Sequence, residues 1–513
     1  MLTPGAPMRI VIVGGGTAGW LTAAFLSRQL PLTASRKIEI TLVEASDIPT
    51  VGVGEATIPS LRQTLAACGM GEAEFLKNCD ATFKHGIRFQ QWRRAVETDP
   101  GEAYFHPFGD PLTIGTISPV RQWSRLDPST RSAFADIFSV QPELALAGRA
   151  PKHLRDGDFD GALPYAYHLD AGKFAEFLKR GLRQRTVTQI IAKVVDADQD
   201  EAGNINHVTL DSGDRLTADL YIDCTGFSAR LINADKTNSF ISKSHQLFVD
   251  RAVTTRVAHG GVEAINGYTN CTAQSSGWIW DIALRNRRGV GHVYSSRHTD
   301  DEEATSDLAA YLGLPKDEIE TRKLDMRIGY HAQQWRRNCV AIGLSSGFLE
   351  PLESTGIYLI EMANWALADF IPRFIAGAAP QAKYNSIMAN HYENIVDFLK
   401  LHYCLSERRD SAFWRDNVSD ESIPETLKSN LATWRDAIPS VYDFDRTTQC
   451  FSATNYQFVL FGMGWRGHLQ SESPDPLTQQ MMDELARRRE QLKQFVLRDT
   501  MPNSEIFAAI NAA

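Results

Sequence analysis

Six residues near the N-terminus have the types and the spacing needed to hold a phosphate group. They read Gly14-Gly15-Gly16-Thr17-Ala18-Gly19. Glycines let the backbone approach a pyrophosphate closely, and the first turn of a following helix offers free N–H groups to the anion. Further along, Glu44 is an acid that can accept hydrogen bonds from a ribose. We therefore predict a dinucleotide site that includes Gly14, Gly16, Thr17, Ala18, Gly19 and Glu44.

The segments on both sides of this turn are those that such a site requires. Residues 9–13 are a β-branched run typical of a buried parallel strand. Residues 20–30 carry apolar side chains at helical spacing, and Pro31 follows them. Residues 38–43 predict a second strand, which ends in Glu44. The order of strand, glycine turn, helix, strand and acid predicts the beginning of a Rossmann-type fold.

A second match to the glycine pattern, at residues 462–467, lacks this context. No convincing helix follows it, and no acid stands at the appropriate distance. We interpret it as a loop without a cofactor.

Two later segments indicate FAD rather than NAD. Residues 218–227 predict a strand that ends in Asp223 and a turn of small residues, as in the second signature of FAD-binding oxidoreductases. Residues 338–344 resemble the strand and turn that approach the flavin ribityl chain in that superfamily, with Leu344 where an Asp is usual. The three segments predict one discontinuous FAD-binding core, made of about 1–100, 160–235 and 325–372.

No second well-formed dinucleotide motif is visible in the sequence. We therefore expect no built-in NAD(P)H site, and we expect a separate NAD(P)H-dependent flavin reductase to supply FADH2.

The remaining chain predicts two further regions. Residues 236–324 contain alternating strand patterns at 247–257, 277–284 and 291–295, which predict an inserted antiparallel sheet on the substrate side. Residues 373–513 become helical, at 382–401, 426–436 and 477–496, and predict a substrate-capping region. The expected fold class is α/β, with a Rossmann-type core like those of glutathione reductase and flavin monooxygenases.

Composition excludes several classes of protein. Lys and Arg number 53 against 62 Asp and Glu, so the net charge of −9 argues against a nucleic-acid binder. The apolar runs are far shorter than a membrane span, and no signal peptide is visible. The seven cysteines are scattered without a CxxC pair, which predicts reduced thiols, no metal site and a cytoplasmic location.

Several segments resemble one family. Residues 348–357 (Phe-Leu-Glu-Pro-Leu-Glu-Ser-Thr-Gly-Ile) match the Fx.Px.Sx.G pattern of flavin-dependent halogenases at Phe348, Pro351, Ser354 and Gly356. Other matches are residues 52–59 (Gly-Val-Gly-Glu-Ala-Thr-Ile-Pro), 82–86 (Thr-Phe-Lys-His-Gly), 106–108 (His-Pro-Phe) and 278–283 (Trp-Ile-Trp-Asp-Ile-Ala). The sequence is thereby identified as a member of the tryptophan-halogenase-like branch.

The resemblance implies a reaction in which FADH2, O2 and halide produce hypohalous acid, which then halogenates an electron-rich aromatic ring. It places the halide at the backbone N–H groups of Thr355 and Gly356, a glycine-containing turn that can form an anion nest. It gives Lys84 and Glu353 catalytic roles, and it places Ile357 against the isoalloxazine ring. It also implies that Trp278 and Trp280 line a passage, that His106 and Phe108 contact the substrate, and that Val194 contacts the adenine through its backbone.

Two departures from the family pattern bear on the substrate. Ala283 stands where the WxWxIP motif has proline. Residues 451–465 are apolar and aromatic, without the Tyr-Tyr pair and the acid that clamp free tryptophan in relatives. Because an apolar pocket suits an uncharged molecule better than a zwitterion, we expect indole or an indole derivative.

Two other functions remain open from the sequence. An FAD-dependent aromatic monooxygenase shares the FAD core but does not need Lys84 or the turn at 353–356. A non-catalytic FAD-binding protein would bind flavin without turnover. The sequence does not decide between chloride and bromide, the ring position or the oligomeric state.

Overall fold

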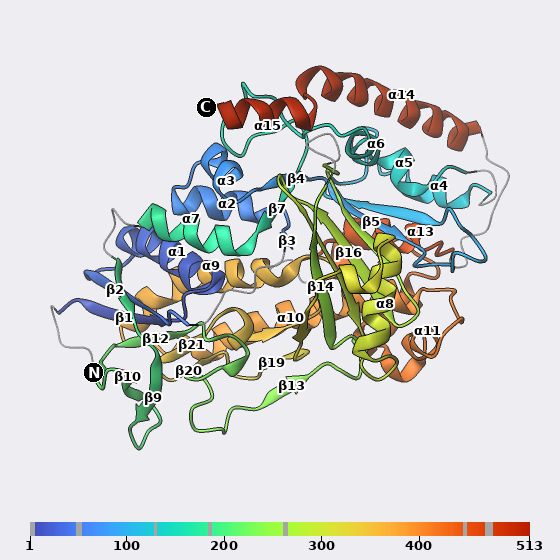
Figure 1. Cartoon of the computed structure of the whole chain (residues 1–513). Coiled ribbons are helices and arrows are strands. Elements are labelled where there is room, and N and C mark those ends of the chain that lie inside the picture. Colours follow the sequence, from blue (N-terminus) through green and yellow to red (C-terminus); the bar gives the residue numbers. More distant parts are fainter. Residues whose placement is uncertain are drawn as a thin grey trace. The chain divides into compact units, whose positions relative to one another are not determined.

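A computed structural model describes residues 6–47, 54–127, 131–182, 187–259, 265–444, 449–466 and 476–512. The chain divides into two compact units (Figure 1), each built from three separate segments. The first unit comprises Met1–Ala81, Leu169–Lys243 and Arg327–Tyr392. The second comprises Thr82–His168, Ser244–Met326 and Glu393–Ala513. The predicted division, with a core of about 1–100, 160–235 and 325–372, an inserted sheet and a cap from 373, has other bounds and stays a prediction.

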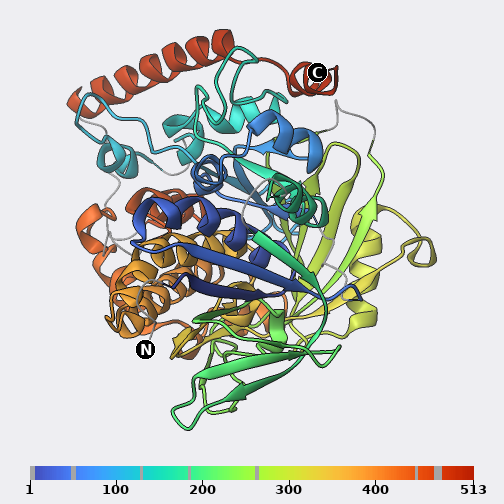
Figure 2. The ribbon, with the colours of Figure 1, turned by 90° about the vertical axis from the view of Figure 1, so that its left-hand side faces the viewer.

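The first unit is organised around a six-stranded sheet with the order β20-β21-β12-β1-β2-β8. These strands are β1 (Met8–Val13), β2 (Ile38–Glu44), β8 (Val187–Ile191), β12 (Leu220–Asp223), β20 (Trp335–Arg336) and β21 (Cys339–Ala341). All pairs are parallel except β20 with β21. Val13 is in register with Val43 and with Asp223, so the carboxyl ends of three strands meet at one edge. Figure 2 shows the blue strands of this sheet near the centre.

Helix α1 (Thr17–Thr33) follows β1, as the sequence predicts, but it is longer than predicted. The expected helix ended before Pro31, whereas this proline lies inside the last turn. A proline lacks the N–H group that would bond to the carbonyl four residues earlier, so α1 lacks that hydrogen bond at Pro31. The hydrogen bond from the Ala34 N–H to the Leu30 carbonyl, 2.8 Å long, closes the helix beyond the proline.

The first unit contains further helices and strands besides those of this sheet. The helices are α2 (Ser60–Cys68), α3 (Glu72–Asn78), α7 (Ala171–Leu182) and α9 (Thr355–Ile375). The further strands are β3 (Gly54–Ala56), β9 (Val194–Gln199), β10 (Ile205–Leu210), β11 (Arg215–Leu216), β13 (Phe240–Ser242), β19 (Gly329–His331) and β22 (Gly347–Phe348). Strands β9 to β11 form an antiparallel three-stranded sheet, which contains the hairpin expected at 208–216.

The second unit contains a seven-stranded sheet with the order β18-β14-β17-β16-β15-β5-β6. The strands are β5 (Gly86–Gln90), β6 (Ala103–Pro107), β14 (Arg251–Val257), β15 (Thr269–Ala273), β16 (Gly277–Ala283), β17 (Arg288–Tyr294) and β18 (Arg322–Asp325). The strands expected at 247–257, 277–284 and 291–295 are present with shifted ends. The pairs are antiparallel except β15 with β5. Strands β5 and β6 were not predicted.

The C-terminal part of the chain is helical, as expected. The three predicted helices correspond to α10 (Gln381–Cys404), α12 (Glu425–Thr433) and α14 (Pro476–Asp499). The remaining helices of the second unit are α4 (Val120–Arg125), α5 (Phe134–Phe138), α6 (Gln141–Leu146), α8 (Asp301–Leu312), α11 (Ala412–Asn417), α13 (Ala453–Gly462) and α15 (Asn503–Ala512). In the described part of the chain, none of the helices combines the length and apolar character needed to cross a bilayer.

The second glycine motif begins where a helix ends. Gly462 is the last residue of α13, so a helix rather than a strand precedes the motif. Its last residue, Gly467, lies outside the described residues. This context differs from that of a dinucleotide-binding turn, which follows a strand.

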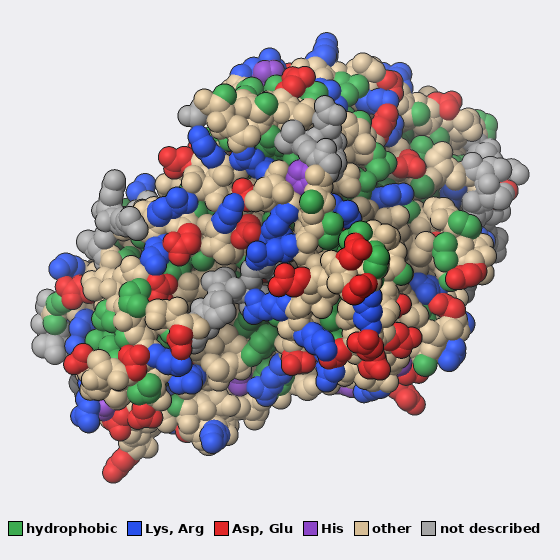
Figure 3. Space-filling view, in the orientation of Figure 1, with side chains coloured by type: hydrophobic (Ala, Val, Ile, Leu, Met, Phe, Trp, Pro, Cys, Tyr) green, Lys and Arg blue, Asp and Glu red, His purple; other side chains and the backbone are tan. Residues whose placement is uncertain are grey.

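Acidic and basic side chains are intermixed on the surface. Figure 3 shows both kinds over the face that it draws, with acidic side chains gathered over α8. The first turn of α8 contains Asp301, Glu302 and Glu303.

Candidate active site

The first unit contains a cavity of about 630 Å³ at the carboxyl edge of its parallel sheet. Its lining includes residues 13–18 at the end of β1, 43–46 at the end of β2, 224–226 after β12, 342–344 after β21, and 355–357 at the start of α9. Three of these segments are those that the sequence singled out as FAD signatures. The ends of parallel strands are where α/β folds bind nucleotides.

The glycines of the N-terminal turn serve two different purposes. Gly14 has a φ of +121°, and a Cβ there would lie 2.2 Å from the Cys224 carbonyl oxygen. A Cβ on Gly19 would lie 1.9 Å from the Gly14 carbonyl oxygen, so both glycines are required by the protein's own packing. Gly16 is different, because a Cβ there would meet no atom within 4 Å, although Gly16 lines the cavity. The open space beside Gly16 fits a phosphate group lying against the backbone.

Glu44 lies at the cavity with its carboxylate already held by three donors. Its Oε1 accepts from Lys179 Nζ at 2.7 Å and from the Gln189 amide, and its Oε2 accepts from Trp20 Nε1 at 3.1 Å. A Cβ on Gly15 would lie 2.2 Å from Glu44 Oε2. The predicted ribose acceptor is therefore oriented before any ligand arrives, by side chains that sequence reasoning missed.

Asp223, at the end of β12, shapes a turn and does not line the cavity. One carboxylate oxygen accepts from the Thr225 N–H and hydroxyl, and the other accepts from the N–H groups of Leu231 and Ile232. Burial raises the pKa of this carboxyl, and these hydrogen bonds oppose the rise. The acid thus holds the chain that follows β12 in a tight turn along the cavity.

Val194 and Leu344, which the sequence analysis assigns to cofactor contacts, both line the cavity. The Val194 carbonyl accepts a hydrogen bond from Arg230 Nη1 at 2.9 Å. An adenine that contacts the Val194 backbone would therefore lie beside Arg230, which also lines the cavity. Leu344 follows Gly343, whose φ of +71° turns the chain toward the glycine turn of β1.

The start of α9 presents backbone donors to the same cavity. Ser354 precedes the helix with a left-handed φ of 62°, and its side chain caps no N–H group. Thr355 and Gly356 are the first two helical residues, so their N–H groups have no partner within the helix. A Cβ on Gly356 would meet no atom within 4 Å. These donors and this space fit a small anion, and Ile357 lies beside them in the lining.

Of the two acidic residues Glu55 and Glu353, only Glu55 lines the cavity. Glu55, on β3, lines the cavity, and burial raises its pKa to about 7. Sequence reasoning did not assign it a role, and its neighbours Gly52 and Val53 lie outside the described residues. Glu353, predicted as catalytic, is buried but is not part of this cavity's lining.

Lys84 lies in the second unit on β4 (Thr82–Lys84), which pairs antiparallel with β7 (Ala166–Asp170). Its side chain is fully buried, and its Nζ lies 5.1 Å from the centroid of the Phe108 ring. This geometry is a cation–π contact. The two residues that the sequence predicts for catalysis and substrate contact are thus brought together.

A buried histidine shares this region with Lys84. The His168 ring contacts Thr269 Oγ1 at 2.8 Å and Thr82 Oγ1 at 3.4 Å. Burial, with the positive charge of Lys84, lowers the pKa of His168 well below its ordinary value. The Thr82 hydroxyl donates to the Ala283 carbonyl at 2.7 Å, so the residue that replaces the motif proline anchors this network through its backbone.

His106, Trp278 and Trp280 are each packed among aromatic rings of the second unit. His106 lies 5.6 Å from Phe398 between ring centroids, and its Nε2 is 3.0 Å from Asn455 Nδ2. Trp278 and Trp280 alternate on β16, with ring centroids 6.3 Å apart. A passage lined by the two indoles stays a prediction.

Comparison with known proteins identifies the family. The family model described as tryptophan halogenase matches residues 9–483. The chain belongs to the tryptophan halogenase family. A tryptophan 6-halogenase from Streptomyces toxytricini is 34% identical over 98% of both chains, and a tryptophan 7-halogenase from Lentzea aerocolonigenes is 33% identical over 91% of both. A solved tryptophan halogenase from Shewanella frigidimarina, 36% identical, superposes with a TM-score of 0.91 over 98% of this chain and 97% of that chain.

The family settles the cofactor and the class of reaction. The protein is a flavin-dependent halogenase, an enzyme that uses FADH2, O2 and halide on an aromatic substrate. Its α/β fold with a Rossmann-type FAD-binding core is the one expected from the sequence. The cavity of the first unit has open space beside Gly16 and Gly356, and the first residues of α9 are part of its lining.

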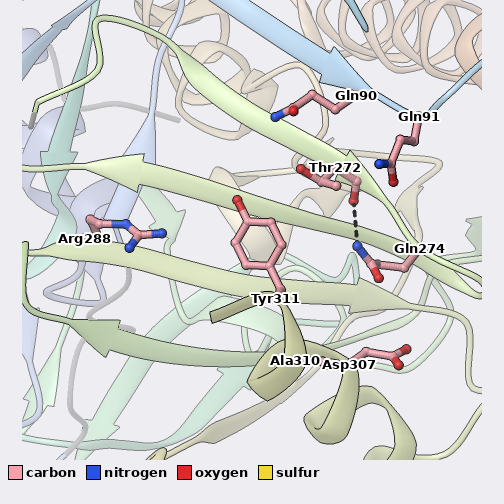
Figure 4. A pocket seen from close by; sticks show the side chains of 8 residues that line it. All are labelled: Gln90, Gln91, Thr272, Gln274, Arg288, Asp307, Ala310 and Tyr311. Atoms are coloured by element: carbon pink, nitrogen blue, oxygen red, sulfur yellow. Dashed lines mark hydrogen bonds between the residues drawn. The ribbon is translucent and has the colours of Figure 1, made fainter. Parts of the chain in front are cut away.

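A second pocket of this halogenase, of about 540 Å³, lies in the second unit between the sheet and α8 (Figure 4). It is polar, with the side chains of Gln90, Gln91, Thr272, Gln274, Arg288, Asp307 and Tyr311 in its lining. Arg288 is paired with Asp281, and the Tyr311 hydroxyl donates to the same carboxylate at 3.2 Å. None of the predicted site residues belongs to this pocket.

Proposed function

We propose that this halogenase oxidises halide in the cavity of the first unit and transfers the halogen to an indole ring beside Lys84. The observation that carries the proposal is the joint lining of one cavity by the Gly14–Ala18 turn and by the N–H groups of Thr355 and Gly356. A dinucleotide cradle and an anion nest in one cavity suit a flavin and a halide that must meet.

The cofactor contacts follow from this placement. The turn residues Gly14, Gly16, Thr17, Ala18 and Gly19 receive the pyrophosphate, and Glu44 receives the ribose. Val194 lies along the adenine, Leu344 along the ribityl chain and Ile357 against the ring. Bound as FADH2, the flavin reduces O2 and supplies the oxidising equivalents for the halide.

Lys84 and Glu353 act on the product of that oxidation. The ammonium group of Lys84 donates a hydrogen bond to the oxygen of hypohalous acid, or its amine forms a haloamine, which in either case makes the halogen electrophilic. The ring carbon forms its bond to halogen as the halogen–oxygen bond breaks and the leaving hydroxide takes a proton from Lys84 to become water, or as the halogen–nitrogen bond of the haloamine breaks and the Lys84 amine is released. The ring carbon then loses its proton to the Glu353 carboxylate. Trp278 and Trp280 line the passage, which keeps the oxidant from bulk protein and water.

The substrate that this site favours is indole or an uncharged indole derivative. Residues 449–466 include no Asp or Glu, and the α13 region supplies aromatic rings instead. Phe398 stacks on Phe451 at 3.8 Å between centroids and lies 4.9 Å from Tyr456. Burying a zwitterion against such rings costs several kcal/mol without paired charges, whereas indole loses little. His106 and Phe108 complete this substrate contact.

A separate NAD(P)H-dependent flavin reductase supplies the FADH2. In the described part of the chain, the GxGxxG pattern lies between a strand and a helix only at residues 14–19, and that turn lines the cavity of the first unit. A cytoplasmic location, where thiols stay reduced, accompanies this partner.

Mass spectrometry of a turnover mixture tests the proposal. The mixture contains the protein, FAD, NADH, a flavin reductase, O2, bromide and chloride, with indole and tryptophan in separate reactions. We expect a halogen isotope doublet on indole that is lost in Lys84→Ala and retained in Lys37→Ala, a control at an exposed lysine. A product heavier by one oxygen, with free peroxide scavenged, would instead identify an aromatic monooxygenase. Flavin binding without any product would contradict the proposal.

A further inference from the structure

His106 and Asn455 meet inside the second unit, although 349 positions separate them in the chain. His106 is on β6 and is 3% exposed. Asn455 lies in the first turn of α13, and its Nδ2 is 3.0 Å from His106 Nε2. This distance is that of a hydrogen bond, so one of the two nitrogens donates and the other accepts.

The cap of α13 fixes which way the Asn455 amide faces. The backbone N–H of Ser452 donates to Asn455 Oδ1 at 2.8 Å, and the Ser452 hydroxyl donates to the same oxygen at 3.0 Å. A flipped amide would point its NH2 group at the Ser452 N–H, and two donors would face each other. The oxygen therefore stays at the helix cap, and the NH2 group stays toward His106.

The orientation of the amide determines the protonation of the imidazole. An amide NH2 group can only donate, so His106 Nε2 must accept through its lone pair. The proton of the neutral ring is then on Nδ1. Protonation at Nε2 would again set two donors against each other.

We propose that Asn455 is a positioning residue that holds His106 as the neutral, Nδ1-protonated imidazole and thereby selects an uncharged indole as substrate. The proposal rests on the proposed function in placing His106 beside the substrate and in taking that substrate to be an indole. A neutral ring with a fixed plane packs against an indole, whereas an imidazolium would attract a carboxylate such as that of an amino acid. The hydrogen bonds at the start of α13 therefore determine both the tautomer of His106 and the substrate preference.

Nuclear magnetic resonance of the holoenzyme with 15N-labelled histidine tests the tautomer directly. The His106 signals are assigned by their loss in His106→Gln. We expect a pyridine-type Nε2 and a pyrrole-type Nδ1 in the natural protein. In Asn455→Asp, whose carboxylate can only accept, we expect Nε2 to become pyrrole-type. A protonated Nε2 in the natural protein, or an unchanged signal in Asn455→Asp, would overturn the proposal.

Binding of indole tests the selection without turnover. We expect the indole dissociation constant to rise about tenfold in Asn455→Asp, the size of one well-formed hydrogen bond. Asn286→Asp is the matched control, because it makes the same substitution at an exposed asparagine between β16 and β17. It should leave the tautomer and indole binding unchanged, and thermal melting checks that both variants fold.

The two experiments separate the possible failures. If the tautomer is as expected but indole binds Asn455→Asp as it binds the natural protein, the selection is refuted while the tautomer stands. If the natural protein halogenates other rings and not indole, the proposed substrate fails, and the histidine signals still decide the role of Asn455.

Discussion

The cavity of the first unit and the Lys84 region of the second hold their polar groups in opposite ways. The cavity offers backbone N–H groups at Gly16, Thr355 and Gly356, two of them glycines with open space where a Cβ would be. The Lys84 region uses buried side chains, each fixed by another side chain or by a carbonyl of a distant segment. The cavity, which uses backbone groups, should tolerate changes of its side chains but should be sensitive to an added Cβ at Gly16 or Gly356. The Lys84 region is sensitive to any change of side chain.

The largest effect should come from the side-chain arrangement. Lys84→Met keeps the bulk of the side chain and removes the ammonium group, and we expect the rate of halogenation to fall about 10³-fold, as for loss of a general acid. FAD affinity, measured by quenching of flavin fluorescence, should not change, because Lys84 does not line the cavity of the first unit. A parallel loss of FAD binding would show that the two regions do not divide the chemistry in this way.

Substitution by alanine should have different effects at Gly16 and Gly14, two glycines that line the cavity of the first unit. In Gly16→Ala the methyl group enters open space in the cavity, so we expect FAD affinity to fall about 100-fold with little change in melting temperature. In Gly14→Ala the methyl group meets the Cys224 carbonyl at a positive φ, so the melting temperature should fall as well. Calorimetry and flavin titration of both variants measure the difference. Equal melting temperatures in the two variants would contradict this distinction.

A glycine of the second unit should show the reverse pattern. A Cβ on Gly291 would lie 2.2 Å from the Trp280 ring, so Gly291→Ala forces that indole to move. We expect a loss of about 1–3 kcal/mol in stability, the usual effect of overpacking. Urea unfolding measures the loss, and FAD affinity should stay constant. Retained stability would show that the Trp280 ring has room to shift.

The smallest effect concerns a buried acid of the first unit, Glu361 on α9. It accepts from Thr64 Oγ1 at 2.6 Å and Ser60 Oγ at 3.1 Å, and burial raises its pKa to about 8. The folded state therefore holds this proton more tightly than the unfolded state, so stability falls as pH rises from about 4.5 to 8. We expect Glu361→Gln to reduce the drop in melting temperature between pH 6 and pH 9. If the drop in melting temperature were unchanged in Glu361→Gln, other ionisable groups would be its cause.

The contrast between the regions also explains what could be predicted from the sequence. The strand, turn and helix around Gly14 follow one another directly, so spacing alone predicts them. Two of the three partners of Glu44, Lys179 and Gln189, lie 135 and 145 positions away, where no local pattern marks them. Strands β5 and β6 were missed for the same reason, since they complete a sheet whose other strands begin at residue 251.

Some site residues could be predicted only from the resemblance to a family, and not from their spacing in the sequence. Lys84 is one of many lysines by its local sequence, and its burial follows from the pairing of β4 with β7. Asn455 carried no signal, because its role depends on a strand that lies far from it in the chain. Pro31 misled the prediction of a helix end, because the helix continues past the proline and closes with the bond from the Ala34 N–H to the Leu30 carbonyl.

The three-segment construction of each unit has a consequence for how the protein is made. The first unit takes its last segment from Arg327–Tyr392, and the second takes its last from Glu393–Ala513. During synthesis on the ribosome, neither unit has all of its segments until late in translation, so long stretches emerge before their partners exist. We expect production of this protein to depend on chaperones and on slow translation at low temperature more than that of a protein with consecutive domains.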